Sequence, residues 1–431
     1  MDKHSFIFCD NNIDYYPLYR LSVLNPSAQF DIQNYSHYRV RPHLYGDNGV
    51  FKSEKVIILA NNVCNLKCVY CYAAQGHNKT TPVLKLDQVE TFIDYIIKTQ
   101  KEKRDTKLKV VFLGGGEPFM SLPLIKGAVN YIHKRTQSEG LERTIEIVTN
   151  GTFINNDIIK WLKEFDIRLD VSFEILEDIQ QAQRGQYNRV HKALQLLDKE
   201  GIIYKTRTVI TPLNVSKMKE MIHISKDFYP NNKEVRMELV SSDTNSEIFF
   251  EEFVKHYFAA KEVADKYDIK INNSKINAFN YLRDYHCYPE LALTPEGNVS
   301  ICHRHSNTNN PLYEKFSMGK VESIEMMDAH KIRNTYDCKM KDCQKCIAQY
   351  HCGGGCVYNN IMLPHQRKDY CKMMILAVKL QILQKLIPNL YSSFINESMT
   401  YNEFSKNIHT HLKEKIAFYP LSNQKKYDDS F

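Results

Sequence analysis

Three cysteines stand together in Cys64-Asn65-Leu66-Lys67-Cys68-Val69-Tyr70-Cys71, just after the apolar run Lys55–Ala60. Three thiolates with C-x3-C-x2-C spacing on one loop are typical ligands of a soft metal or an iron–sulfur group. A four-iron cluster held by three cysteines keeps its fourth iron open for a reactant. Zinc normally takes a fourth protein ligand, and the nearest candidate, His77, lies six residues past Cys71. The spacing therefore favours iron–sulfur over zinc.

The composition is that of a soluble globular protein, with 43% hydrophobic and 25% charged residues. The 431 residues predict two or three folding units. No run of 18 apolar residues predicts a membrane span, and the first ten residues lack the apolar core of a signal peptide. The net charge of +7 permits an acidic partner, but no basic aromatic stripe indicates nucleic-acid binding.

The twelve cysteines cluster strongly along the chain. Three lie in residues 64–71, eight in residues 287–371, and Cys9 stands alone. Without an export signal, clustered cysteines indicate metal ligands in a reducing compartment rather than disulfides. We therefore expect a cytoplasmic metalloprotein, with Cys9 a small buried hydrophobe.

From Lys55 onward, short apolar runs alternate with amphipathic stretches, a pattern typical of repeated β-α units. The predicted strands are Lys55–Ala60, Lys109–Leu113, Thr144–Thr149, Leu169–Phe173, Tyr204–Ile210 and Val235–Val240. The helices predicted between them are Leu86–Lys98, Asn156–Phe165 and Val190–Lys199. Six such units predict an α/β fold with a curled parallel sheet, whose active site gathers at the carboxyl ends of the strands.

We divide the chain into five parts: an N-terminal extension (1–54), the barrel (55–245), a bridging helical region (246–281), a cysteine-rich domain (282–372) and C-terminal helices with a tail (373–431). The extension is expected to add a few strands packed on the core. The bridging helix, Ile248–Tyr267, is expected to lead out of the barrel. Further helices are predicted at Cys371–Leu390 and Tyr401–Phe418, before a polar, disordered end.

The C-x3-C-x-aromatic-C motif after a first strand resembles the signature of radical S-adenosylmethionine (SAM) enzymes. The resemblance implies a partial (β/α)6 barrel and a [4Fe–4S] cluster held by Cys64, Cys68 and Cys71. In that family the open iron chelates the amino and carboxylate groups of SAM, and an electron from the cluster cleaves SAM to a 5′-deoxyadenosyl radical. Tyr70 matches the aromatic residue that packs near the adenine of SAM in that family. Without the cysteines, Tyr70 would be interpreted as an aromatic residue of the core.

Further motifs resemble the family's SAM site at successive strand ends. Gly114-Gly115-Gly116-Glu117-Pro118 is similar to the motif that holds the amino group of SAM, although a lone triple glycine also suits a tight turn. Thr149-Asn150-Gly151 is similar to its T-N-G turn. Asp170–Ile175 resembles its S-I-D-G segment through Ser172 but departs from it at Glu174 and Ile175. Arg184 is similar to the arginine that pairs with the SAM carboxylate, a task that suits a guanidinium fork; the alternative is a surface arginine.

The second group of cysteines has the spacing Cys287-x9-Gly297-x4-Cys302, then Cys343-x2-Cys346-x5-Cys352-x3-Cys356-x14-Cys371. This pattern resembles the seven-cysteine SPASM extension of radical SAM enzymes that modify peptides and proteins. The resemblance implies two auxiliary [4Fe–4S] clusters. The first takes Cys287, Cys302 and Cys356, with Cys338 or an open iron at the fourth corner; the second takes Cys343, Cys346, Cys352 and Cys371. Taken alone, the region equally suits zinc knuckles.

The resemblance implies a peptide maturase that abstracts hydrogen from a ribosomal precursor peptide, while auxiliary clusters accept the electron that completes an oxidative crosslink or thioether. An anaerobic sulfatase-maturating enzyme, which forms formylglycine, is the alternative. Those enzymes carry an aspartate directly after the second cysteine of the block, where this chain has His303. His303 is a candidate base or simply a surface residue.

The expected partners are the precursor peptide or protein and a reductant such as flavodoxin or ferredoxin. The 54 residues before the barrel are too few for a winged-helix leader-binding domain, so leader recognition would use a separate protein or the barrel surface. A non-catalytic zinc scaffold is the alternative from another class.

Overall fold

The computed structural model describes residues 3–8, 11–39, 55–73, 83–102, 106–241, 247–276, 282–283, 285–287, 290–305, 310–324, 329–337, 339–396 and 415–419. Cys9 and the 401–414 part of the predicted terminal helix lie outside these ranges. Over the described part of the chain, no helix is long and apolar enough to cross a membrane.

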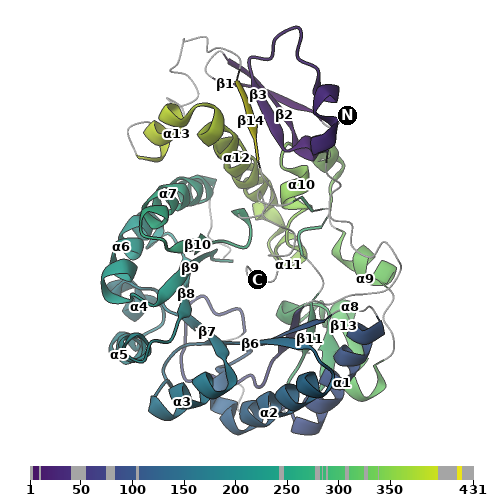
Figure 1. The fold of residues 1–431 in the computed structure, drawn as a ribbon, viewed down its shortest axis with the longest axis vertical. Helices are drawn as coiled ribbons and strands as arrows, with labels where there is room; N and C mark the ends of the chain where they lie inside the picture. Colours follow the sequence, from purple (N-terminus) through teal and green to yellow (C-terminus); the bar gives the residue numbers. More distant parts are fainter. Residues whose placement is uncertain are drawn as a thin grey trace.

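A curved parallel sheet forms the centre of the molecule (Figure 1). Its barrel strands stand side by side in chain order: β4 (Lys55–Ile58), β5 (Lys107–Phe112), β6 (Glu142–Thr149), β7 (Ile167–Ser172), β8 (Tyr204–Ile210) and β9 (Asn232–Leu239). At one end β10 (Lys270–Asn272) pairs with β9. At the other end β11 (Leu291–Leu293) pairs with β4, and β12 (Asn298–Ser300) and β13 (Ser317–Lys320) extend the sheet beyond it as antiparallel strands. The predicted α/β fold and its six strands are confirmed to within a few residues.

Helices cover the outer, convex side of this sheet in Figure 1. They are α1 (Leu86–Glu102), α2 (Leu122–Ser138), α3 (Asn156–Phe165), α4 (Glu177–Gln183), α5 (Tyr187–Lys199), α6 (Met218–Phe228) and α7 (Glu247–Lys266). Strand β8 shows the consequence, since its residues alternate between fully buried positions and half-exposed ones such as Lys205 and Arg207. The buried set faces the helices, and the other set faces the interior of the barrel.

The bridging region differs from expectation. Helix α7 packs against α6, and the strand that follows it, β10, pairs in parallel with β9 through Ile271 and Val235. Residues 247–272 therefore add another helix–strand unit to the barrel instead of leading out of it.

The cysteine-rich region is joined to the barrel by backbone pairing, because β11 pairs with β4 through Ala292 and Ile57. Its other elements are short: β12 (Asn298–Ser300), α8 (Tyr313–Phe316), β13 (Ser317–Lys320), α9 (Ala329–Tyr336), α10 (Gln349–Cys352) and α11 (Val357–Met362). The long helix α12 (Arg367–Leu386) follows, then α13 (Pro388–Ile395). Helix α12 packs on α7 of the barrel.

The two ends of the chain form one small antiparallel sheet of β1 (His4–Phe8), β2 (Asn11–Tyr16), β3 (Leu21–Leu24) and β14 (Lys415–Phe418). The predicted helix Tyr401–Phe418 is therefore wrong at its end, since Lys415–Phe418 pairs with β3 as a strand. The N-terminal extension does supply the expected strands. Its Tyr15 hydroxyl lies 2.8 Å from Nε2 of His351 in the cysteine-rich region.

Candidate active site

The first cysteine loop follows β4 at the carboxyl edge of the barrel sheet. Cys68 is buried, and Cys64 and Cys71 are half-buried. The Leu66 N–H donates to Sγ of Cys64 at 3.4 Å, and Nδ2 of Asn150 lies 3.9 Å from the same sulfur. Burial raises the pKa of the Cys64 and Cys68 thiols. Sulfurs that already receive N–H groups suit bound thiolates, so the loop fits an iron–sulfur group.

The three glycines after β5 let their loop lie directly against the cysteine loop. The Gly116 N–H donates to the Asn61 carbonyl at 3.0 Å, and the Glu117 N–H donates to the Val63 carbonyl at 2.8 Å. A Cβ on Gly116 would stand 1.9 Å from the Val63 oxygen, and one on Gly114 would stand 1.6 Å from the Gly116 oxygen. A Cβ on Gly115 would stand 2.1 Å from the Asn62 side-chain oxygen. Gly115 and Gly116 thus allow the close contact with the cysteine loop, and Gly114 allows the tight turn of its own loop.

The carboxylate of Glu117 is fully used inside the protein. It accepts hydrogen bonds from the Thr149 hydroxyl at 2.6 Å, the Asn150 N–H at 2.7 Å and the Phe119 N–H at 3.1 Å. Burial raises the pKa of Glu117, and these three donors oppose the shift. The side chain therefore joins the end of β5 to the end of β6.

Asn150 continues this chain of contacts to the cysteine loop. Its Nδ2 donates to Oδ1 of Asn65 at 2.8 Å, while its Oδ1 accepts from the Thr152 hydroxyl at 2.6 Å. Asn65 in turn donates to Thr152 at 2.9 Å. The predicted motif residues Glu117 and Asn150 thus act as positioning residues for the loop that carries Cys64.

Tyr70, Glu174 and Arg184 form a group beside the cysteine loop, in which the Glu174 and Arg184 side chains are buried and Tyr70 is half-buried. The Tyr70 hydroxyl donates to Glu174 and accepts from Nη1 of Arg184 at 2.7 Å, and that nitrogen lies 3.7 Å from the Glu174 carboxylate. Glu174 also accepts from Thr208 at 2.7 Å and from the Val209 N–H at 3.0 Å. The sequence assigned no role to Glu174. Its contacts with Tyr70 and Arg184, two predicted SAM-binding residues, make it a positioning residue for both.

Arg184 keeps one donor unused. Burial opposes its charge, but Tyr70, Cys68 and Glu174 outweigh burial and raise the pKa of Arg184. Its Nε is buried and makes no hydrogen bond among the described residues. Arg184 is therefore a fixed cation beside the loop with capacity for an anionic group, which fits a bound carboxylate.

The end of β7 departs from the family pattern in its backbone as well. Ile175 stands at the glycine position with φ of 67°, a left-handed conformation that is a genuine outlier for a β-branched residue. Its side chain is fully buried. Ser172, three residues earlier, is half-buried and lies opposite Arg207 of β8.

The interior of the barrel below this edge is filled by charged side chains. Arg207 lies 2.6 Å and Arg236 lies 3.5 Å from the same oxygen of Asp170. Lys109 and Lys205 lie 4.0 and 3.5 Å from Glu146. The two acids, on β6 and β7, are flanked by the cations of β5, β8 and β9, so no buried charge in this set stands alone.

Part of the second group of cysteines meets around one cavity. The four that line it are those predicted for one auxiliary cluster: Cys343, Cys346, Cys352 and Cys371. They come from the segment before α10, from α10 itself and from α12. Burial raises the pKa of Cys352 to about 12.

The remaining set of cysteines also comes together. Cys287 and Cys356 share a hydrogen bond, which together with burial raises the pKa of Cys287, and Cys302 is a further electrostatic neighbour. Arg304 is a cationic neighbour of Cys356 and Cys302, and Lys275 is one of Cys356. The proposed fourth ligand, Cys338, lies outside the described residues. Within the described ranges, no three His, Cys, Asp or Glu side chains surround a single-ion site.

His303 directly follows Cys302 of the set formed by Cys287, Cys302 and Cys356. Its Nδ1 contacts the Glu290 carboxylate, which also lies 3.4 Å from Lys55. Burial opposes ionisation of Glu290, but His303 and Lys55 lower its pKa overall. The ring of Tyr72, next to Cys71, packs edge-on against His303 with centroids 6.2 Å apart. His303 is thus held between the two cysteine regions, and Glu290 is a partner that the sequence did not indicate.

Comparisons with known proteins agree with this geometry. Residues 58–224 match the radical SAM superfamily. The cysteine-type anaerobic sulfatase-maturating enzyme of Clostridium novyi is 25% identical over 161 residues, which cover 35% of this chain and 42% of that enzyme. The chain thus matches less than half of that relative's length.

Two solved structures share the fold. The structure of anSMEcpe with bound AdoMet has a TM-score of 0.63 at 15% identity, over 78% of this chain and 99% of that one. Streptococcus suis SuiB bound to precursor peptide SuiA has a TM-score of 0.53 at 15% identity, over 73% and 74%. The matched residues 58–224 span the cysteine loop, Glu117 and Arg184, so the chain contains a radical SAM domain.

Proposed function

We propose that this protein is a radical SAM maturase that modifies a peptide or protein and holds two auxiliary [4Fe–4S] clusters in a SPASM-type domain. The observation that carries the proposal is the second cysteine region. Four cysteines spread over residues 343–371 line one cavity, and Cys287, Cys302 and Cys356 gather as a separate set. Two sets of thiolates near a radical SAM site suit extra iron–sulfur clusters better than scattered structural cysteines.

At the first site, each group has a defined task. Cys64, Cys68 and Cys71 would hold the SAM-binding cluster, which with SAM supplies hydrogen-atom abstraction. Arg184 would bind the SAM carboxylate through its unused Nε, with its orientation fixed by Tyr70 and Glu174. Burial beneath the loop keeps water from these contacts.

The cations around the second set have a matching task. Lys275 is buried and Arg304 is half-buried near Cys356, and they would offset the negative charge of thiolates and of an added electron. Such a site suits an electron acceptor for a net oxidation of the substrate. A reductant such as flavodoxin or ferredoxin would supply the electron that the SAM-binding cluster needs for SAM cleavage.

A peptide substrate is supported by relatives of similar fold, since SuiB was solved with its precursor peptide and anSMEcpe with peptides. His303, held by Glu290 near Tyr72, is our candidate proton acceptor for that substrate. A precursor leader would be recognised by a separate protein or by the barrel surface.

The test is anaerobic co-expression of the enzyme with candidate precursor peptides encoded beside its gene, followed by mass spectrometry. We expect a loss of two hydrogens from one peptide, formation of 5′-deoxyadenosine, and no aldehyde trapped by hydrazine. If the purified protein contains zinc instead of iron and leaves every peptide unmodified, the proposal is contradicted.

Formylglycine formation is the second candidate, because sulfatase-maturating enzymes are among the relatives. An aldehyde at a Cys or Ser of a sulfatase-derived peptide would establish it in place of the crosslinking reaction.

A further inference from the structure

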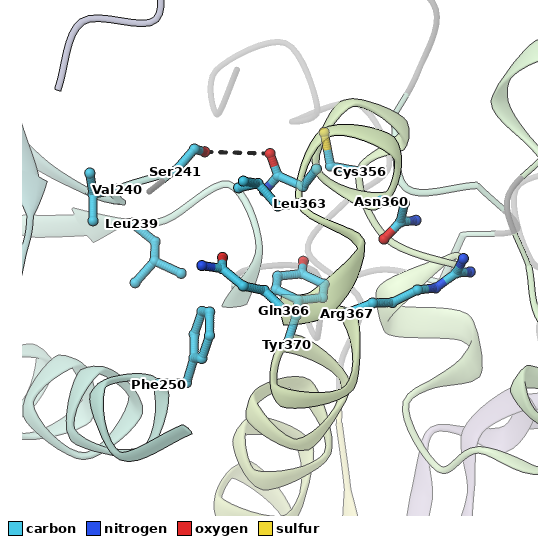
Figure 2. Close-up of a pocket in the computed structure, with 11 residues that line it drawn as sticks. Leu239, Val240, Ser241, Phe250, Cys356, Asn360, Leu363, Gln366, Arg367 and Tyr370 are labelled. Carbon is cyan, nitrogen blue, oxygen red and sulfur yellow. Dashed lines mark hydrogen bonds between the residues drawn. The ribbon is translucent and has the colours of Figure 1, made fainter. Parts of the chain in front are cut away.

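Tyr370, near the start of α12, stands between the two sets of cysteines. It lines the cavity that contains Cys343, Cys346, Cys352 and Cys371. It also lines a second cavity, whose wall includes Cys356 of the other set (Figure 2). Among the described residues, the side chains shared by both cavity walls are Asn360, Arg367 and Tyr370.

Within the described part of the chain, the Tyr370 hydroxyl has no hydrogen-bond partner. The residue is only 8% exposed, and its oxygen is buried without a hydrogen bond among the described residues. A buried hydroxyl left unpaired is costly, so it normally meets a donor or acceptor that completes the site. A phenol hydroxyl can donate one hydrogen bond.

The surroundings hold the ring firmly in this position. The His286 ring packs edge-on against it at 6.4 Å between centroids, and Nζ of Lys275 lies 5.5 Å from the ring centroid. A buried hydroxyl donor on a residue that lines both cysteine-containing cavities is suited to a sulfur acceptor. Hydrogen bonds to the sulfurs of an iron–sulfur cluster favour its reduced, more negative form and raise its reduction potential.

We propose that the buried hydroxyl of Tyr370 donates a hydrogen bond to an auxiliary iron–sulfur cluster at the junction of the two cysteine sets and raises that cluster's reduction potential. The inference rests on the proposed function, since it requires auxiliary clusters to be present. Tyr370 is then a positioning and tuning residue for electron acceptance, not a group that touches substrate.

The experiment uses the variant Cys64→Ala/Cys68→Ala/Cys71→Ala as background, so that only auxiliary clusters contribute to the signal. Tyr370→Phe, which removes the oxygen and keeps the ring, is compared with the background in a potentiometric titration monitored by electron paramagnetic resonance. We expect unchanged iron content. At a fixed solution potential, the ratio of reduced to oxidised auxiliary cluster should fall about fivefold, the effect of one modest hydrogen bond.

Tyr391→Phe is the matched control. Tyr391 on α13 is also fully buried, and its hydroxyl likewise has no partner among the described residues. Its charged neighbours are Glu262 and Asp265 rather than cysteines. This variant should leave the auxiliary potentials unchanged.

The outcomes separate the two claims. If the background variant binds no iron, the auxiliary clusters are absent, and both the proposed function and this inference fail. If it binds iron and Tyr370→Phe leaves every potential where it was, or raises one, the inference alone is overturned.

Discussion

Glu174 and Arg184 illustrate how single residues of this barrel meet the cost of burial. Arg184 is a buried cation whose carboxylate partner is fully buried at 3.7 Å. Removing one partner of such a pair leaves an uncompensated charge, which is far more destabilising than losing a surface pair. Arg184 was predicted from a motif, whereas Glu174 became visible only through contacts made across β7 and β8.

Glu174→Ala should therefore destabilise the barrel strongly, by about 3 kcal/mol. We expect the thermal midpoint of anaerobically prepared protein to fall by roughly 5–10 °C, measured by circular dichroism. The exposed Glu177→Ala, three residues away, serves as control and should change the midpoint little. Equal midpoints for the two variants would show that the pair with Arg184 does not stabilise the fold.

Lys109 gives a prediction with a defined pH dependence. Burial lowers its pKa to about 8, despite the opposing effect of Glu146. The folded chain thus binds this proton less tightly than the unfolded chain, so the free energy of unfolding rises with pH between about 8 and 10.5. Below pH 8 the full cost of the buried charge is present.

Lys109→Met should remove that rise. The difference in thermal midpoint, wild type minus variant, should become more positive from pH 7.5 to pH 10. Lys107→Met, an exposed lysine of the same strand, should keep the wild-type slope. Parallel pH profiles for wild type and Lys109→Met would contradict the burial of a titrating Lys109.

Elements near the edges of the sheet were the hardest to predict. Strands β10 and β11 are three residues each, and their pairing with β9 and β4 depends on contacts that no local periodicity carries. Lys415–Phe418 was predicted helical and is a strand, because pairing with β3 overrides its local pattern. Helices α2 and α6 were not predicted, although both have ordinary amphipathic patterns. On α2, for example, Ile125, Val129 and Ile132 form the buried face.

The glycine loop after β5 yields a test at the element scale. Gly116→Ala places a Cβ 1.9 Å from the Val63 oxygen, and backbone atoms on both sides must move. We expect the variant to keep its fold but to lose about four iron atoms per chain, since the cysteine loop is displaced. Gly127→Ala on α2, which meets only the flexible Leu86 side chain at 3.1 Å, should retain full iron content.

At the scale of the whole molecule, the chain closes on itself around the cysteine sites. Lys415 pairs with Leu24, and Tyr15 of the same small sheet reaches His351 beside Cys352. The sequence predicted which cysteines form each set, because their spacing is a motif. It did not predict that both ends of the chain support the second set, since those partners lie hundreds of residues apart.

The central claim is that one chain holds a SAM-binding cluster and two auxiliary clusters. The most direct test is the iron content of anaerobically purified protein, wild type against Cys64→Ala/Cys68→Ala/Cys71→Ala. We predict about twelve iron atoms per chain in the wild type and about eight in the variant. About four in the wild type with none in the variant, or zinc in place of iron, would contradict the account.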